Sequence, residues 1–184
     1  MHVLLLLFQF ITAGAITNKN PFKALITMLP AYMTALGTQS SAATIPITLM
    51  QAKKNGVDED VADFVIPLCA TIHLSGSMLK IVACAYAIMF MTGMSAGTEM
   101  FAGFIMMLGI TMIAAPGVPG GAIMAAVALL QSMLGFDETL IGLMIALYIT
   151  MDSFGTACNV TGDGAIAMVM NKVNRRLKRE KVSV

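Results

Sequence analysis

Four polar side chains recur at intervals of four, three and four residues within one apolar segment near the C-terminus: Asp152, Thr156, Asn159 and Asp163. At 100° per residue, this spacing places all four on one face of an α-helix, as a stripe about 16 Å long. An ionised carboxylate in an apolar helix costs free energy unless it meets a cation or a hydrogen-bond donor. The two carboxylates are too far apart to share a proton. The stripe therefore predicts two cation sites, one for an ammonium group and one for a metal ion.

Two more ionisable residues lie in apolar surroundings and leave alternatives open. Lys80 is the one basic residue inside a long apolar stretch. It could neutralise an aspartate, which would make the stripe a structural polar seam, or extend its ammonium group to a membrane surface. His73 could be a proton-coupling site or a hydrogen-bonded helix contact. A membrane-embedded enzyme could use Asp152 or His73 as an acid or base, but the chain has neither a metal-ligand motif nor a nucleophile paired with a base.

The composition indicates a membrane protein. Hydrophobic residues make up 58% of the chain and charged residues only 11%, whereas a soluble domain carries about 25% charged residues. Six of the 11 Lys and Arg residues fall within 172–184, where a basic tail would meet anionic lipid headgroups. A net charge of +1 gives no reason to expect a nucleic-acid partner. The three cysteines lack CxxC spacing and predict neither a zinc site nor a disulfide framework.

The elements that must position these residues form a pattern that occurs twice. Each occurrence is a pair of apolar arms around a small, polar centre, followed by a long helix with a polar middle. The predicted segments are a partial or full transmembrane helix at 1–17, a first re-entrant hairpin at 22–51, an interrupted helix at 61–93, a second hairpin at 100–134, an interrupted helix at 139–171 and a basic cytoplasmic tail at 172–184, the last five forming a transport core over 18–184. A cleaved signal peptide is the alternative for 1–17.

The hairpin arms are about 14–16 residues long, whereas a full span needs about 20. We therefore expect the hairpins to re-enter the membrane instead of forming four conventional spans. Breaks at membrane depth are tolerated only against protein or a water-filled site, and paired breaks are typical of a transporter's binding site. Re-entry puts ten of the 11 Lys and Arg residues on one side. The positive-inside rule then predicts a multi-pass protein of the cell (inner) membrane with a cytoplasmic C-terminus.

Four motifs resemble the dicarboxylate/amino acid:cation (sodium) symporter family, which includes glutamate/aspartate and neutral amino acid transporters. They are the runs 40–46 (SSAATIP), 67–72 (PLCATI), 117–122 (GVPGGA) and 152–163 (DSFGTACNVTGD). The resemblance covers nearly the whole chain and corresponds to the C-terminal, transport-core portion of the family. It implies an all-α integral membrane fold with two re-entrant hairpins and two interrupted helices in an inverted repeat, and a homotrimer in the full-length protein. It also implies Na+-coupled symport of an amino acid or dicarboxylate, with no cofactor beyond the coupling ion.

The resemblance assigns roles residue by residue. Asp152 would hold the amino group of the substrate, Thr156 and Asn159 its polar head, and the hairpin tips would add backbone contacts. The full predicted substrate site is Ser40, Ser41, Ser77, Val118, Gly121, Asp152, Thr156 and Asn159. The predicted Na+ ligands are Asp163 with backbone carbonyls of Cys69, His73 and Asn159.

The chain departs from the family pattern in three places. Residues 73–77 read His-Leu-Ser-Gly-Ser where the family has Asn-Met-Asp-Gly-Thr. One sodium site is therefore expected to be weakened, lost or replaced by proton coupling. Gly155 occupies the position of an arginine that binds acidic substrates in the family, so a neutral or small amino acid is favoured over an acidic one. Family members also carry scaffold helices before this region. The alternative is thus a truncated, non-transporting fragment that needs a separate scaffold chain.

Overall fold

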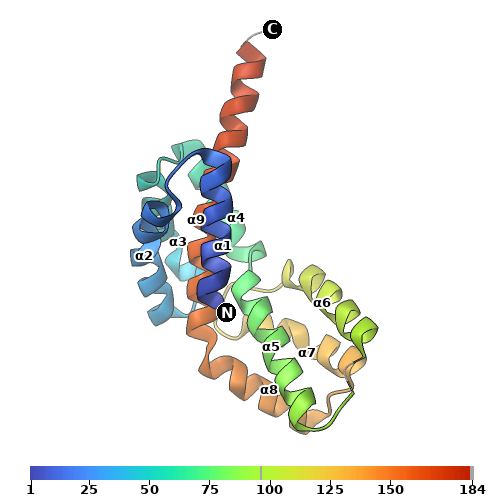
Figure 1. The fold of residues 1–184 in the computed structure, drawn as a ribbon. Coiled ribbons are helices and arrows are strands. Elements are labelled where there is room, and N and C mark those ends of the chain that lie inside the picture. Colours follow the sequence, from blue (N-terminus) through green and yellow to red (C-terminus); the bar gives the residue numbers. More distant parts are fainter. Residues whose placement is uncertain (96, 183–184) are drawn as a thin grey trace.

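The computed structural model describes residues 1–95 and 97–182, and these form α-helices joined by short connectors (Figure 1). Residue 96 of the connector at 94–99 and residues 183–184 of the predicted tail lie outside the described residues. The helices are α1 (His2–Thr17), α2 (Pro21–Thr38), α3 (Ser41–Lys54), α4 (Glu59–Ile72), α5 (Ser75–Met91), α6 (Thr98–Met112), α7 (Gly121–Leu134), α8 (Glu138–Thr150) and α9 (Asp152–Val182). The described part of the chain is therefore all-helical, as predicted.

Local sequence explains the sharp turn between α2 and α3. Gln39 directly follows the end of α2 and has φ 52°, a left-handed conformation that few residues other than glycine adopt. Ser40 follows in an extended conformation and caps α3, because its hydroxyl oxygen accepts a hydrogen bond from the backbone N–H of Ala43 at 3.2 Å. Helices α6 and α7 are joined by the longer turn 113–120, where Gly120 has φ 74°. Both predicted tips are thus turns between two helices.

Two long segments are broken near the predicted positions. His73 and Leu74 separate α4 from α5. Met151 separates α8 from α9, and the two helices are bent by 59° at this point. The second break lies at the N-terminal end of the polar stripe, so that Asp152 is the first residue of α9. Helix α9 also continues through residues 172–182, which were predicted as a tail.

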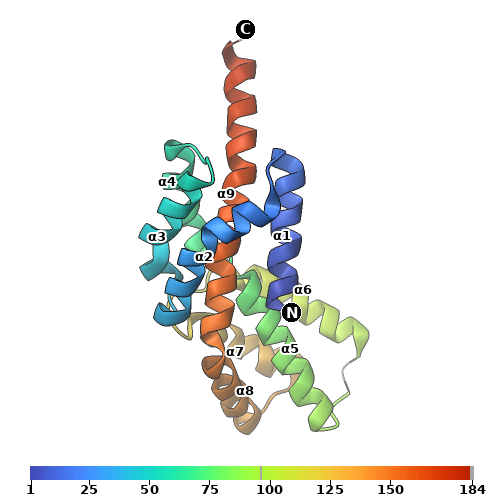
Figure 2. The ribbon, with the colours of Figure 1, turned by 60° about the vertical axis from the view of Figure 1, so that its left-hand side comes forward.

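The helices pack around two separate apolar cores. The first core contains buried side chains from α1, α2, α3, α4 and α9, and the second contains buried side chains from α5, α6, α7 and α8. Each broken helix therefore has one half in each core. Figures 1 and 2 show α9 running along the first core, with α5 to α8 gathered around its N-terminal end. The chain passes between the cores at the two helix breaks.

Helix lengths and apolar surface agree with a membrane setting. Within the described residues, the run Glu59–Met91 is long and apolar enough to span a membrane, and the bent pair α8–α9 qualifies if it is taken as one span. Helices α1, α6 and α7 are apolar but shorter. At 1.5 Å per residue, α6 is about 22 Å long, less than the ~30 Å hydrocarbon core. Large apolar side chains such as Phe64, Phe90 and Met106 are exposed.

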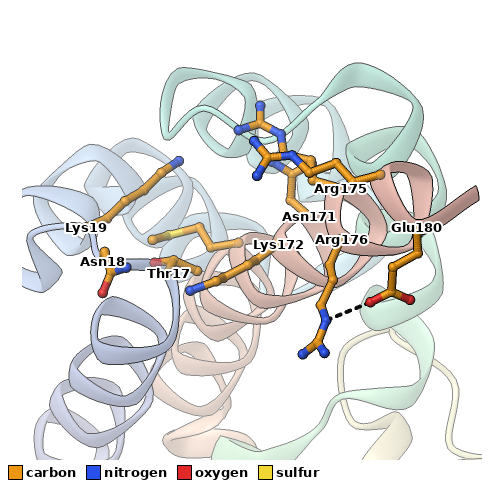
Figure 3. A pocket seen from close by; sticks show the side chains of 10 residues that line it. Thr17, Asn18, Lys19, Asn171, Lys172, Arg175, Arg176 and Glu180 are labelled. Atoms are coloured by element: carbon orange, nitrogen blue, oxygen red, sulfur yellow. Dashed lines mark hydrogen bonds and ion pairs between the residues drawn. The ribbon is translucent and has the colours of Figure 1, made fainter. Parts of the chain in front are cut away.

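Charged residues gather at one end of the bundle, where the connectors around residues 18–23 and 52–60 meet the C-terminal half of α9. Lys19 Nζ donates to the backbone oxygen of Asn55, and Arg175 forms an ion pair with Asp58 at 2.5 Å. A cavity of about 440 Å³ lies here, lined mainly by basic and amide side chains of α9 and the α1–α2 connector (Figure 3). The three basic segments predicted to share one side therefore contact one another.

Candidate functional site

The polar stripe of α9 is buried in the centre of the molecule. Asp152, Thr156, Asn159 and Asp163 are each at most 5% exposed. Two of them lie beside the break between α4 and α5: Asn159 contacts the start of α5, and Asp163 contacts the end of α4. The stripe therefore lies where the two apolar cores meet.

Asn159 joins α9 to the first turn of α5. Its Oδ1 accepts hydrogen bonds from the backbone N–H groups of Gly76 at 2.7 Å and Ser77 at 3.4 Å, and its Nδ2 donates to Ser77 Oγ at 2.9 Å. The two helices approach so closely that a Cβ on Gly76 would lie 2.7 Å from the backbone oxygen of Gly155. Free N–H groups at a helix N-terminus need acceptors, and Asn159 supplies one from the facing helix.

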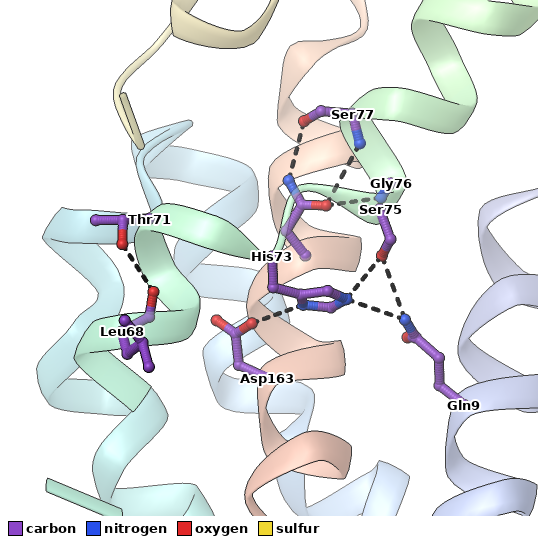
Figure 4. A network of polar contacts seen from close by, with 9 residues as sticks. Gln9, Leu68, Thr71, His73, Ser75, Gly76, Ser77 and Asp163 are labelled. Atoms are coloured by element: carbon purple, nitrogen blue, oxygen red, sulfur yellow. Dashed lines mark hydrogen bonds and ion pairs between the residues drawn. The ribbon is translucent and has the colours of Figure 1, made fainter. Parts of the chain in front are cut away.

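Asp163 pairs with the side chain of His73. Its Oδ1 lies 2.8 Å from His73 Nδ1, and the carboxylate is 1% exposed. On its other side, His73 Nε2 lies 2.9 Å from Ser75 Oγ and 3.2 Å from Gln9 Nε2 (Figure 4). The imidazole thereby links Asp163 on α9 to Ser75 on α5 and Gln9 on α1. Gly162 provides the space, since a Cβ there would lie 2.6 Å from Gln9 Oε1 and 2.7 Å from His73 Cε1.

Gln9 was missed by the sequence reasoning. It comes from α1, on which no site residue was predicted, and its Oε1 is buried with no hydrogen-bond partner in the described structure. Its sequence signal is a single amide side chain within an otherwise apolar helix. Burying an amide at such a position costs free energy unless it meets polar partners. Here the Gln9 Nε2 group contacts His73 and Ser75.

Asp152 is held by a lysine and by the second hairpin tip. Its Oδ1 lies 3.0 Å from Lys80 Nζ, and its Oδ2 accepts a hydrogen bond from the backbone N–H of Gly120 at 2.9 Å. Lys80 Nζ also donates to the backbone oxygen of Tyr148 at 3.2 Å and lies 3.4 Å from the centroid of that ring. Lys80 is only 4% exposed. Of the alternatives for this residue, Lys80 neutralises an aspartate and does not extend to a membrane surface.

The two hairpin tips contact each other over the stripe. The backbone oxygen of Gly117 in the second tip accepts hydrogen bonds from Ser40 Oγ at 3.1 Å and from the backbone N–H of Ala42 at 3.3 Å. The cavity left between the tips and α9 measures about 10 Å³, about the space of one water molecule. The site is therefore closed in this conformation.

The cavity brings together most, but not all, of the predicted substrate-binding residues. Six of the eight line it: Ser41, Ser77, Val118, Asp152, Thr156 and Asn159. Ser40 lies in the turn of the first tip and Gly121 is the first residue of α7, and neither lines the cavity. Val118 is 51% exposed, so it lies at the rim.

The predicted Na+ ligands lie around the first helix break. The backbone oxygen of Cys69 accepts a hydrogen bond from the backbone N–H of His73 at 2.8 Å. No group of three or more His, Cys, Asp or Glu side chains capable of holding a metal ion occurs within residues 1–95 and 97–182. A cation here would depend on the Asp163 carboxylate and on backbone oxygens, which are ligands that suit a hard cation.

Comparison with known proteins identifies the family. Residues 1–173 match the sequence model of the sodium:dicarboxylate symporter family. The chain is 36% identical to excitatory amino acid transporter 1 of Homo sapiens over 165 residues, which are 87% of this chain and 30% of that protein. It is 31% identical to neutral amino acid transporter A of Homo sapiens over 170 residues, 89% of this chain and 31% of that protein.

A third relative, excitatory amino acid transporter 3 of Mus musculus, is 33% identical over 166 residues, 88% of this chain and 31% of that protein. The chain thus spans about a third of the length of these curated relatives. The resemblance drawn from the sequence motifs is confirmed over almost the whole chain. The chain belongs to the sodium:dicarboxylate symporter family.

Proposed function

We propose that this chain forms the substrate-carrying core of a secondary active transporter that couples Na+ movement to uptake of an amino acid. The observation that carries the proposal is the convergence of four irregular segments on one buried polar site. Two hairpin tips and the ends of two broken helices meet around Asp152 and Asn159. Irregular backbone at membrane depth is tolerated where it lines such a site.

In this proposal α2–α3 and α6–α7 are re-entrant hairpins, and each hairpin with its following broken helix is one unit of an inverted repeat. The exchange of helix halves between the two cores supports this arrangement, because α5 packs with the second hairpin and α9 with the first. The basic end of the bundle would face the cytoplasm. Scaffold helices, a homotrimeric assembly and the surrounding lipid would hold the core in the full-length protein.

Substrate contacts are proposed for the residues around the closed cavity. Asp152 would receive the amino group, Thr156 and Asn159 the polar head, and backbone groups near Ser41 and Val118 would close over it. Gly155 leaves no guanidinium group for a second carboxylate. A small or neutral amino acid is therefore the proposed substrate, ahead of an acidic amino acid or a dicarboxylate.

Na+ would bind near Asp163, with backbone oxygens of Cys69, His73 and Asn159. The His73 side chain already contacts this carboxylate, so an entering ion would have to share Asp163 with the imidazole. The ion site is consequently expected to be weaker than a site built from a free carboxylate and an amide.

Uptake by the full-length protein in proteoliposomes tests the proposal. Labelled serine, alanine, aspartate and succinate are offered with an inward Na+ gradient and with equal Na+ on both sides. We expect gradient-dependent uptake of serine or alanine, lost in Asp152→Asn. Uptake that ignores the gradient for all four compounds would overturn the assignment.

One observation favours a second candidate, a non-transporting fragment. Both buried aspartates already contact a cationic or imidazole group of the chain, and the cavity is almost closed. If the folded protein takes up none of the four compounds, and none of them shifts its thermal unfolding, the fragment is the better description.

A further inference from the structure

We propose that Lys80 holds the carboxylate of the substrate, and that Asp152 stores this lysine while the site is empty. The substrate is then a zwitterionic amino acid that inserts between Asp152 and Lys80, its ammonium group on the aspartate and its carboxylate on the lysine. This inference rests on the proposed function, because it assigns the ligand of the same site.

Lys80 lies directly behind the wall of the substrate cavity, in contact with two of the residues that line it. The lysine comes from α5, but its Nζ lies 3.0 Å from Asp152 Oδ1, which lines the cavity. The ammonium group also lies 3.4 Å from the ring centroid of Tyr148, another lining residue. A substrate that separates Asp152 from Lys80 would therefore meet the ammonium group of the lysine.

Gly155 explains how Lys80 fits there. A Cβ at position 155 would lie 3.3 Å from Lys80 Nζ and 3.4 Å from Ser77 Oγ. The ammonium group thus occupies the space into which a side chain at 155 would extend. An arginine at 155 would bring a second cation against Lys80. The glycine and the lysine are complementary, and the cation of this site comes from α5 instead of α9.

Charge balance selects the ligand. Buried charges are retained only when paired. In the empty site Asp152 and Lys80 pair with each other, while Asp152 also accepts from Gly120. A zwitterion separates the pair but leaves both charges matched, one by its ammonium group and one by its carboxylate. A dicarboxylate without an amino group brings two negative charges and leaves no cation for them, because Lys80 remains bound to Asp152.

The test measures the shift in thermal unfolding of the detergent-solubilised full-length protein with four probes. These are L-alanine, L-lactate, which replaces the ammonium group by a hydroxyl, L-alaninamide, which replaces the carboxylate by an amide, and succinate. For the wild type we expect L-alanine to bind about 10- to 100-fold more tightly than the other three, the range expected for losing one hydrogen bond to a charged group. Equal binding of L-lactate or succinate by the wild type would overturn the inference.

Lys80→Met provides the decisive change. It removes the carboxylate partner and leaves Asp152 open to any ammonium group, so the preference for L-alanine over L-alaninamide should fall to about 1 or reverse. A lysine that only stabilises the fold would lower stability without changing this ratio, and an unchanged ratio refutes the role. Lys80→Arg should keep the preference.

A double variant covers the case in which Lys80→Met does not fold. Lys80→Met with Asp152→Asn removes both charges together and leaves no unpaired ion, so it is expected to fold and to bind none of the four probes. Binding of L-alanine by this variant would contradict the inference. Because these measurements report binding and not Na+-driven uptake, the failure of this inference and the failure of the proposed function are distinguishable.

Discussion

Gly76 allows α5 to begin in direct contact with α9, and its replacement by alanine is a quantitative test of the site. The added Cβ would lie 2.7 Å from both Cys158 Cβ and the backbone oxygen of Gly155. Non-bonded carbon atoms prefer about 3.5–4.0 Å, so the two helices would have to separate by about 1 Å. Both of these atoms are fixed to the backbone of α9 and cannot turn away.

The expected cost follows from this overlap. Overpacking of a close contact costs about 1–3 kcal/mol, and replacing glycine by alanine in a helix returns about 0.5–1 kcal/mol. Taking the middle of both ranges, the net loss of about 1 kcal/mol corresponds to a fall in Tm of about 2–4 °C for a chain of this size. The separation would also lengthen the 2.7 Å hydrogen bond from the Gly76 N–H to Asn159 Oδ1, so substrate affinity should fall as well.

Thermal unfolding in detergent, with and without substrate, measures both effects. Gly142→Ala is the matched control, because Gly142 lies in α8 and a Cβ there meets no atom within 4 Å. This control should be as stable as the wild type or slightly more stable, with unchanged affinity. If Gly76→Ala behaves like the control, the helices are not in contact at Gly76 and the geometry of the site is wrong.

Three further changes test other parts of the molecule. Gly117→Ala would bring a Cβ within 2.5 Å of the Ala70 backbone oxygen. This overlap should oppose closure of the tips by about 1–3 kcal/mol and slow uptake about 5- to 150-fold. Unaltered uptake would show that this contact is not needed. Asp163→Asn keeps an oxygen for the His73 N–H but loses the charge, so Na+ dependence should fall more than thermal stability, and equal losses of protein and activity would instead indicate a structural role. At the basic end, the Arg175 guanidinium lowers the pKa of Asp58. The stabilisation that this ion pair gives to the fold is therefore present above the ordinary carboxyl pKa near 4 and is lost as the pH falls through the lowered pKa of Asp58. Asp58→Asn should reduce the acid sensitivity of the thermal midpoint below about pH 4, and an identical pH profile would show that the pair contributes nothing.

The helix order and the position of the stripe could be predicted from the sequence. Spacing along one helix determines the rotation of each side chain about its axis, so the interval between Asp152 and Asp163 is enough to place both on one face. Runs of Gly, Ser and Pro marked the two tips because few other residues form such turns. The break before α5 was likewise predicted near His73.

The partners of the two aspartates could not be chosen in this way. Lys80 is 72 residues from Asp152, and His73 is 90 residues from Asp163. These pairs depend on how α5 and α9 pack, which hydrophobic spacing within either helix does not specify. An interruption was predicted within 139–171, but its place at Met151 was not, since no Gly or Pro marks it; the break directly precedes Asp152, where the chain leaves the second core. The part of Gln9 could not be predicted either, because its partners His73 and Ser75 lie more than 60 residues away along the chain.

The division of the broken helices between two cores has a consequence for synthesis of the protein. A chain is made from its N-terminus, so α1 to α4 are complete long before α9, the helix that they pack against. The first core must therefore wait for the last helix. His73 and Lys80 have already been synthesised when α9 is made. Asp163 can therefore pair with His73, and Asp152 with Lys80, as soon as α9 packs. Helix α9 can thus pack against helices that already carry a partner for each of its two buried carboxylates.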